Sequence, residues 1–178
     1  LYDTLNRMVL DASINVPKFN EMAVAETQIA RVRETIGDIP FMVTMDRGYP
    51  SIPSFLRMID SKTYFVARLK SSDFKAEQKT LSSDDEDVEI QLTKSRRNHY
   101  MGTADEEIVM SRDSFWLRMV RVWLDEEHTA YEILATNLPQ DLFPTECFGE
   151  IYHLRWRIET AFQVLKDRLQ LENFTGTK

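Results

Sequence analysis

The feature that most constrains the fold is an alternation of short apolar runs with helix-like segments over the first 70 residues. Phe41–Met45 and Tyr64–Ala67 are short apolar runs of the kind that form buried strands. Ser51 and Asn20, both good N-terminal helix caps, precede helix-like segments. Residues 1–15 contain two further extended segments and predict a hairpin. Strands that alternate with helices predict an α/β fold.

The middle of the chain breaks this alternation. Phe115–Leu124 and Ala130–Thr136 are rich in strand-forming residues and are separated by Asp125–His128, which predicts a second hairpin. We interpret residues 71–128 as a mostly β insertion that precedes a long last helix. The predicted domain organisation has three parts: a first part of the core over residues 1–70, the insertion over 71–128, and a second part of the core over 129–178.

Cysteine content and charge exclude few classes of protein. The single cysteine, Cys147, excludes an internal disulfide framework and a cysteine-rich zinc site. A net charge of −7 argues at first sight against a polyanionic partner. Residues 71–137, however, hold eight Lys and Arg against fifteen Asp and Glu and so carry the whole excess. The two ends of the chain are nearly neutral, and the net charge therefore says little about partners.

Targeting signals are not evident in the sequence. No apolar run approaches the roughly 20 residues that span a bilayer, and no basic-then-apolar leader opens the chain. We expect no membrane association and a cytoplasmic location. The chain begins with Leu1 rather than Met, and we expect it to be a fragment of a longer protein.

Ile151–Gln170 has the pattern of an amphipathic helix. At about 100° per residue, one polar stripe runs beside its apolar face, and it consists of Tyr152, Arg155, Glu159 and Lys166. One interpretation is an i, i+4 ion pair between Arg155 and Glu159 on a solvated surface. The other is a half-buried functional carboxylate, which is costly unless it is paired or bound to a metal. The spacing alone leaves both interpretations open.

The stripe is also part of a longer motif. The spacing Tyr-x₂-Arg-x₃-Glu-x₆-Lys from Tyr152 to Lys166 resembles the Y-R-E-K signature of bacterial insertion-sequence DDE transposases of the insertion sequence 4 family. Other segments resemble this family in the same order: MDRGY at Met45–Tyr49, YFVARLK at Tyr64–Lys70 and LATNLP at Leu134–Pro139. The resemblance covers nearly all of the chain outside residues 71–113.

This resemblance implies an RNase H-like fold, in which helices flank a mixed sheet. It also implies three carboxylates that hold two Mg²⁺ or Mn²⁺ ions in the full-length enzyme, of which Asp46 and Glu159 match two. The residues implied to hold DNA phosphates are Tyr152, Arg155, Lys166 and Arg68. Asp46 follows a predicted strand at its carboxyl end, where sites form in α/β sheets. Taken singly, Asp46 is more typical of a loop or cap.

The third carboxylate has no match in this chain. In the family, the first aspartate lies on the first strand, upstream of the segment that resembles residues 1–15. Asp3 and Asp11 belong to later strands in this scheme, and we do not interpret them as substitutes. We therefore expect the first strand and its aspartate to lie outside this chain. We also expect this polypeptide alone to cleave no DNA.

Other aromatic and basic residues give weaker signals. Relatives that form a DNA hairpin place a tryptophan just before the segment that matches Ile133–Thr136. Tyr131 and Glu132 occupy those positions here, so a hairpin pathway is neither favoured nor excluded. Trp116 and Trp123 are predicted to pack on the sheet or in the core. The three histidines show no spacing typical of metal ligands.

One basic cluster lies in the predicted insertion and consists of Lys94, Arg96 and Arg97. A solvated loop and a contact to the DNA backbone both remain open for it.

The function implied by the resemblance is that of the catalytic domain of a DNA transposase, which cleaves and transfers strands at insertion-sequence ends with Mg²⁺. The implied partners are the double-stranded DNA of transposon ends and target and a second copy of the protein, at the bacterial nucleoid. Two alternatives stay open: a non-catalytic DNA-binding remnant, and an RNase H-like nuclease without transfer activity.

Overall fold

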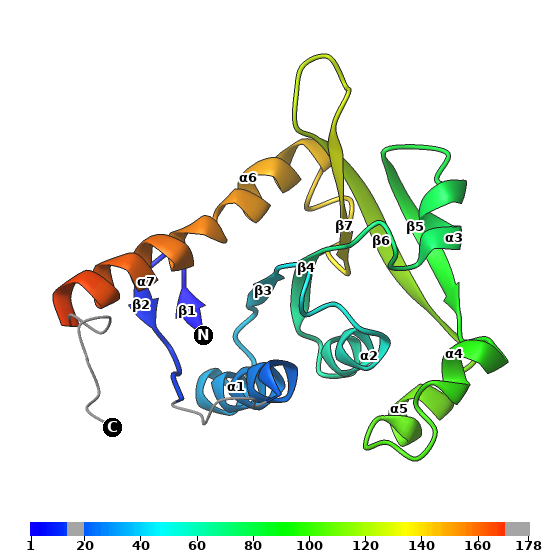
Figure 1. The fold of residues 1–178 in the computed structure, drawn as a ribbon, viewed down its shortest axis with the longest axis horizontal. Helices are drawn as coiled ribbons and strands as arrows, with labels where there is room; N and C mark the ends of the chain where they lie inside the picture. The colour runs from blue at the N-terminus through cyan, green and yellow to red at the C-terminus, as the bar shows by residue number, and fades with distance from the viewer. Residues whose placement is uncertain (14–19, 170–178) are drawn as a thin grey trace, which may run out of the picture. The chain divides into compact units, whose positions relative to one another are not determined.

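The computed structural model describes residues 1–13 and 20–169. The chain divides into two compact units, one formed by Leu1–Ile39 with Glu150–Lys178 and the other by Pro40–Gly149. We call them the terminal unit and the central unit and describe each by itself (Figure 1). No described helix is both long enough and apolar enough to cross a membrane.

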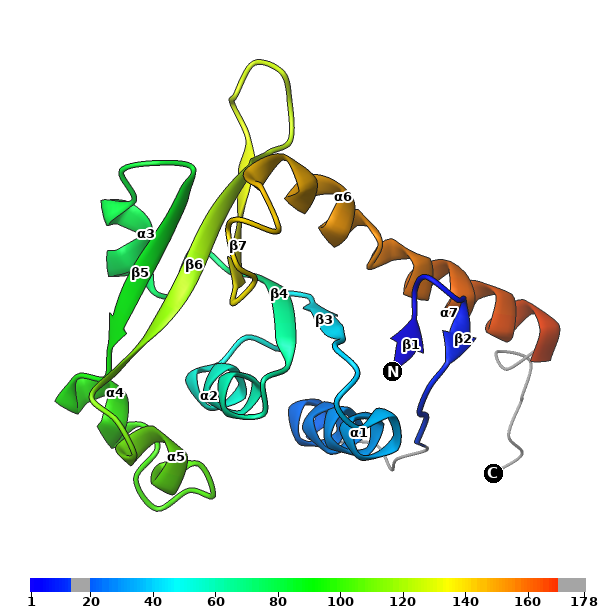
Figure 2. The same cartoon turned by 180° about the vertical axis from the view of Figure 1, so that it is seen from behind.

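The central unit is built on a five-stranded sheet in the order β3-β4-β7-β6-β5 (Figures 1 and 2). Its strands are β3 (Met42–Met45), β4 (Tyr64–Arg68), β5 (Asp85–Gln91), β6 (Ser114–Trp123) and β7 (Tyr131–Thr136). β3 and β4 are parallel, and the other three neighbouring pairs are antiparallel. This mixed sheet with flanking helices is consistent with the RNase H-like fold that the sequence predicts.

Helix α2 (Ile52–Asp60) connects the two parallel strands and covers one face of the sheet. The Ser51 side chain caps it by accepting a hydrogen bond from the Ser54 N–H at 3.2 Å. Phe55 of α2 stacks on Phe65 of β4 with ring centroids 5.0 Å apart, and both side chains are fully buried. The alternation of side chains along β4 therefore directs Phe65 and Ala67 toward α2 and Arg68 toward the opposite face.

Residues 71–128 contain β5, β6 and three short helices: α3 (Lys75–Thr80), α4 (Lys94–Asn98) and α5 (Glu106–Met110). β5 and β6 pair over seven residue positions, from Asp85 opposite Val120 to Gln91 opposite Ser114. β6 also pairs with β7, so residues 71–128 add two strands to the sheet that contains β3 and β4. Its status as an insertion remains a prediction.

Asn137 joins β4 to the end of β7. Its side-chain oxygen accepts a hydrogen bond from the Phe65 N–H, and its amide donates to the carbonyl of Thr63, both at 2.9 Å. Phe65 and Thr63 are fully buried, so these backbone groups have no water to replace Asn137.

We expect Asn137→Ala to lower the free energy of unfolding by about 2–4 kcal/mol, because it removes a hydrogen bond from each of two buried backbone groups. Asn98→Ala, at the exposed end of α4, is the matched control and should cost less than about 1 kcal/mol. Urea unfolding followed by circular dichroism measures both. Equal losses in the two variants would contradict a specific role for Asn137.

The terminal unit holds a two-stranded antiparallel sheet and helix α1. β1 (Tyr2–Asp3) pairs with β2 (Met8–Val9), as the predicted hairpin requires. α1 (Glu21–Ile36) begins at Asn20, whose side chain accepts hydrogen bonds from two backbone N–H groups at 3.1 and 3.3 Å. It ends at Gly37, which has a φ of 60° that glycine adopts easily.

The last helical region begins with a 3₁₀ turn (Thr145–Cys147) and continues as α6 (Phe148–His153) and α7 (Trp156–Leu169). The sequence predicts one continuous helix from Ile151, and the structure corrects this. Around Leu154 and Arg155 the backbone forms i→i−3 bonds, such as Arg157 N–H to Leu154 C=O at 3.1 Å. This turn at residues 154–155 separates the two helices. The predicted end of the helix at Gln170 lies outside the described residues.

Candidate active site at the carboxyl edge of β3 and β4

Asp46 and Arg68 lie level with each other where β3 and β4 end. The parallel register places Met45 opposite Ala67. The residues that follow them, Asp46 and Arg68, therefore stand at the same level of the sheet. Asp46 is half-buried, and its carboxylate accepts a hydrogen bond from the Arg47 N–H at 2.8 Å. Its carbonyl accepts one from Tyr49 N–H at 3.1 Å, which closes a tight turn after the strand.

Arg68 forms an ion pair with Glu132, at the start of the neighbouring strand β7. Arg68 lies opposite Leu134 in the antiparallel register, so Glu132, two residues before Leu134, projects from the same face. The side chains are 19% and 13% exposed. The Nε of Arg68 is buried and makes no hydrogen bond in the described structure.

Three charged side chains of alternating sign therefore follow one another across three adjacent strands: Asp46, Arg68 and Glu132. Arg68 offsets the repulsion that two half-buried carboxylates would otherwise exert on each other. The resemblance did not assign a role to Glu132. In the sequence, Glu132 is visible only as a charged residue directly before the apolar part of a predicted strand. Its partner, Arg68, follows only from the pairing of β4 with β7.

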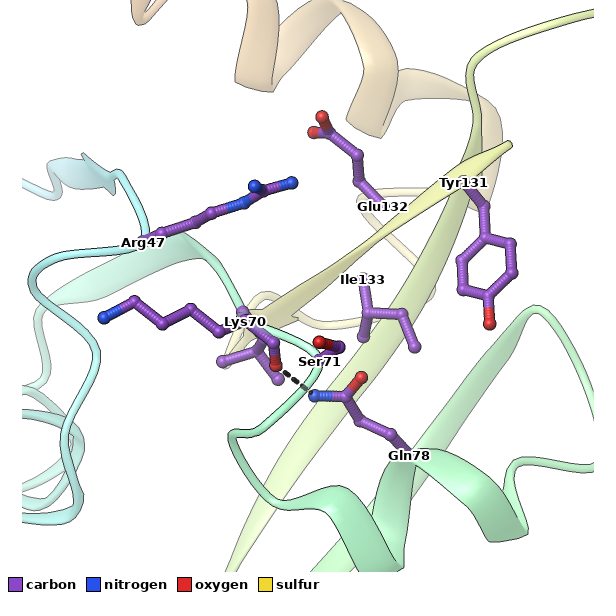
Figure 3. A pocket seen from close by; sticks show the side chains of 8 residues that line it. Arg47, Lys70, Ser71, Gln78, Tyr131, Glu132 and Ile133 are labelled. Atoms are coloured by element: carbon purple, nitrogen blue, oxygen red, sulfur yellow. Dashed lines mark hydrogen bonds between the residues drawn. The ribbon is translucent and has the colours of Figure 1, made fainter.

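A pocket of about 350 Å³ opens beside this edge (Figure 3). The residues that line it come from the turn after β3, from the end of β4 and α3, and from the start of β7: Arg47, Leu69, Lys70, Ser71, Gln78, Tyr131, Glu132 and Ile133. In Figure 3 the side chain of Arg47 extends toward Glu132, whereas the side chain of Lys70 extends in the opposite direction.

The start of α6 is fixed on the face of the sheet that carries these charged groups. The guanidinium of Arg118 lies over the ring of Phe148, 4.8 Å from its centroid. A Cβ at Gly149 would lie 3.8 Å from Val122, which is paired with Glu132 in the sheet. Phe148 and Gly149, the last residues of the central unit, therefore lie on the face of the sheet that carries Arg68 and Glu132.

Arg118 holds the segment before α6 on the sheet. It donates to both carboxylate oxygens of Asp85 at 2.7 and 2.5 Å and to the carbonyl of Leu138 at 3.2 Å. The hydroxyl of Thr145 donates to Asp85 at 2.5 Å. Burial acts to raise the pKa of Asp85, but the hydrogen bonds from Arg118 and Thr145 outweigh it, so the pKa lies below its ordinary value.

The remaining predicted site residues belong to the terminal unit, where three of them are in contact. Tyr152 is buried, and the guanidinium of Arg155 lies 5.6 Å from its ring centroid. Arg155 also forms an ion pair with Glu159 at 3.0 Å, so the i, i+4 pair that the spacing predicts is present. Glu159 is half-exposed at 48%. Lys166 is exposed further along α7.

The other aromatic and basic residues have structural partners. Trp123 stacks on His128 at 4.5 Å and donates to Asp84 at 2.8 Å, whereas Trp116 stands 60% exposed on β6. In the basic cluster on α4, Arg96 pairs with Glu77 and Arg97 with Asp113, which offsets much of its charge.

The donor set at the edge of β3 and β4 is chemically suited to a hard cation. Mg²⁺ and Mn²⁺ prefer oxygen ligands, and Asp46 supplies a carboxylate there. Over the described residues there is no group of three His, Cys, Asp or Glu side chains placed to hold a metal ion. Within the central unit, Asp46 is thus a single candidate ligand rather than part of a complete set.

Comparison with known proteins identifies the family. A family model described as the transposase DDE domain matches residues 1–178. The chain is 41% identical over 46 residues to "Putative transposase InsL for insertion sequence element IS186A" of Escherichia coli strain K12. It has the same identity over the same length to "Transposase for insertion sequence element IS421" of Escherichia coli. Each match covers 26% of this chain and 12% of the relative. Because the family model matches the whole chain, the chain belongs to the transposase DDE domain family.

Proposed function

We propose that this chain is part of the catalytic domain of an insertion sequence 4-type DNA transposase, which performs Mg²⁺-dependent phosphodiester cleavage and strand transfer at insertion-sequence ends. The observation that supports it best is the family match over the whole chain together with Asp46 at the carboxyl end of β3. The Y-R-E-K spacing at Tyr152, Arg155, Glu159 and Lys166 supports the assignment to this family.

In this proposal, Asp46 and Glu159 bind divalent cations, two of which are expected in the full-length enzyme. The bound ions would supply Lewis-acid activation of the attacking oxygen and stabilisation of the leaving oxygen. Tyr152, Arg155, Lys166 and Arg68 hold backbone phosphates of the DNA beside the carboxylates. A guanidinium suits this role because it can donate to two phosphate oxygens at once. The buried Nε of Arg68, which has no hydrogen-bond partner among the described residues, is consistent with a further acceptor from DNA.

Arg155 has a second role in the proposed site. It pairs with Glu159 and lies against Tyr152, so it holds the carboxylate that the proposal assigns to the metal. The sequence left open whether Glu159 is part of a surface ion pair or a functional carboxylate. In this proposal it is both, because Arg155 positions the carboxylate of Glu159. Binding of DNA would require Arg155 to divide its hydrogen bonds between Glu159 and a phosphate.

The proposal keeps the predicted division of the chain, with a core over residues 1–70 and 129–178 and a mostly β insertion over 71–128. It also places the first aspartate outside this polypeptide, which alone would then be inactive. Double-stranded DNA is the proposed substrate, and the proposed active form is a homodimer on paired transposon ends in the bacterial cytoplasm, at the nucleoid.

Metal binding by the 178-residue chain tests the proposed site directly. We expect Asp46→Asn and Glu159→Gln each to weaken Mn²⁺ binding at least tenfold, because each removes a charged oxygen ligand. Isothermal titration calorimetry or Mn²⁺ electron paramagnetic resonance measures the affinity.

Two exposed carboxylates give matched controls, Asp141→Asn in the central unit and Glu34→Gln on α1. Both should leave Mn²⁺ affinity unchanged. If only one of the two site variants weakened binding, Asp46 and Glu159 would not share a metal site, and the proposed function would lose its chemical basis.

Activity assays separate the proposed function from the two alternatives. The 178-residue chain should not nick supercoiled plasmid with Mg²⁺. A longer parent protein should join a pre-cleaved insertion-sequence end to target DNA. Nicking without joining would favour a nuclease, and neither activity in the parent would favour a DNA-binding remnant.

A further inference from the structure

The arginines of the central unit are almost all neutralised by carboxylates. The structure describes every residue of this unit, Pro40–Gly149. Seven of its arginines form ion pairs with an aspartate or glutamate: Arg57, Arg68, Arg96, Arg97, Arg112, Arg118 and Arg121. Within this unit Arg47 is the exception, because its side chain makes no ion pair or hydrogen bond.

Arg47 stands directly after Asp46 and lines the pocket together with a second cation, Lys70. Lys70 is exposed and likewise lacks an ion pair within the described central unit. In Figure 3 the two side chains come from the turn after β3 and from the segment after β4, and they extend in opposite directions. Two uncompensated cations in one pocket are unusual in a chain with a net charge of −7.

The backbone beneath these cations is held in place. The side chain of Gln78 donates to the carbonyl of Lys70 at 2.8 Å, and the Leu69 N–H donates to the carbonyl of Ile133 at 2.9 Å. Glu132 also lines the pocket, but its charge is offset by Arg68. The pocket therefore carries a net positive charge on a fixed backbone.

We propose that Arg47 and Lys70 each bind a backbone phosphate of DNA at this pocket, next to Asp46. The inference rests on the proposed function and adds two contact residues to it. Each cation suits a phosphate, since the guanidinium of Arg47 can donate to two oxygens at once and the ammonium of Lys70 is a compact point charge. The pocket volume of about 350 Å³ is in the range of ligand sites.

The test is the salt dependence of binding between the 178-residue chain and a duplex DNA oligonucleotide, measured by fluorescence anisotropy in EDTA so that metal bridging does not contribute. Each phosphate contact contributes about 0.9 to the slope of log K against log salt concentration. We expect Arg47→Gln and Lys70→Gln each to reduce that slope by about 1 and to weaken binding roughly tenfold. Arg47→Lys and Lys70→Arg, which keep the charge, should retain the original slope.

Arg112→Gln is the matched control, because it removes the same charge from an arginine paired with Asp60 outside the pocket. Its slope should equal that of the unmodified protein. The inference is overturned, with the proposed function intact, if the unmodified chain binds DNA and the pocket variants keep its slope. Absence of salt-dependent DNA binding by the unmodified chain would instead count against the proposed function and, with it, this pocket.

Discussion

Replacement of Arg118 by alanine is expected to lower the free energy of unfolding by about 3–5 kcal/mol, the range found when one partner of a buried ion pair is removed. Arg118 is 4% exposed and Asp85 9% exposed, so the variant leaves a buried carboxylate without its main partner. It also removes the donor to the Leu138 carbonyl and the contact with Phe148. Urea unfolding at neutral pH measures the loss.

Arg97→Ala is the matched control, because the Asp113 partner of Arg97 is 96% exposed. Exposed pairs contribute little, and this variant should lose less than about 1 kcal/mol. Similar losses in the two variants would show that burial of the Arg118–Asp85 ion pair does not increase its contribution to stability.

The same variant should change the response to acid. The pKa of Asp85 lies below its ordinary value in the folded protein, even though burial alone would raise it, because Arg118 and Thr145 donate hydrogen bonds. This contribution to stability is fully present above the unfolded pKa of Asp85 and is lost as pH falls through the lower folded pKa. Without Arg118 the folded pKa rises, so the midpoint of acid unfolding should move to higher pH. An unchanged midpoint would contradict this account.

Phe65→Ala is expected to cost about 3–5 kcal/mol, because it opens a cavity in the centre of the core. Phe65 is fully buried and stacks on Phe55 of α2. It lies on β4, whose register with β3 sets the relative positions of Asp46 and Arg68. Thermal or urea unfolding measures the loss.

Trp116→Ala serves as the control for Phe65→Ala, since it removes a larger aromatic side chain that is 60% exposed on the same sheet. We expect a loss of less than about 1 kcal/mol. If Trp116 proved as costly as Phe65, burial would not be what makes Phe65 important.

Local signals made parts of the fold predictable. Asn20 and Ser51 cap helices at the predicted positions, because a cap requires only a side-chain oxygen beside the first N–H groups of the helix. The apolar runs of β3 and β4 were equally visible. The break between α6 and α7 was not visible in the sequence. The apolar periodicity continues past residues 154–155, although the backbone there forms i→i−3 hydrogen bonds.

By itself, the sequence determined the α/β class, the two apolar strands that end beside Asp46 and Arg68, and the spacing from Tyr152 to Lys166. These features depend only on the order of residues along the chain. Only the tertiary structure decided which charges meet. Glu132 reaches Arg68, and Asp85 reaches Arg118, through the pairing of strands distant in sequence. The sequence gives the charge of each residue, but strand register and burial decide whether another charge neutralises it. For this reason, the lack of an ion pair at Arg47 becomes evident only in the folded central unit.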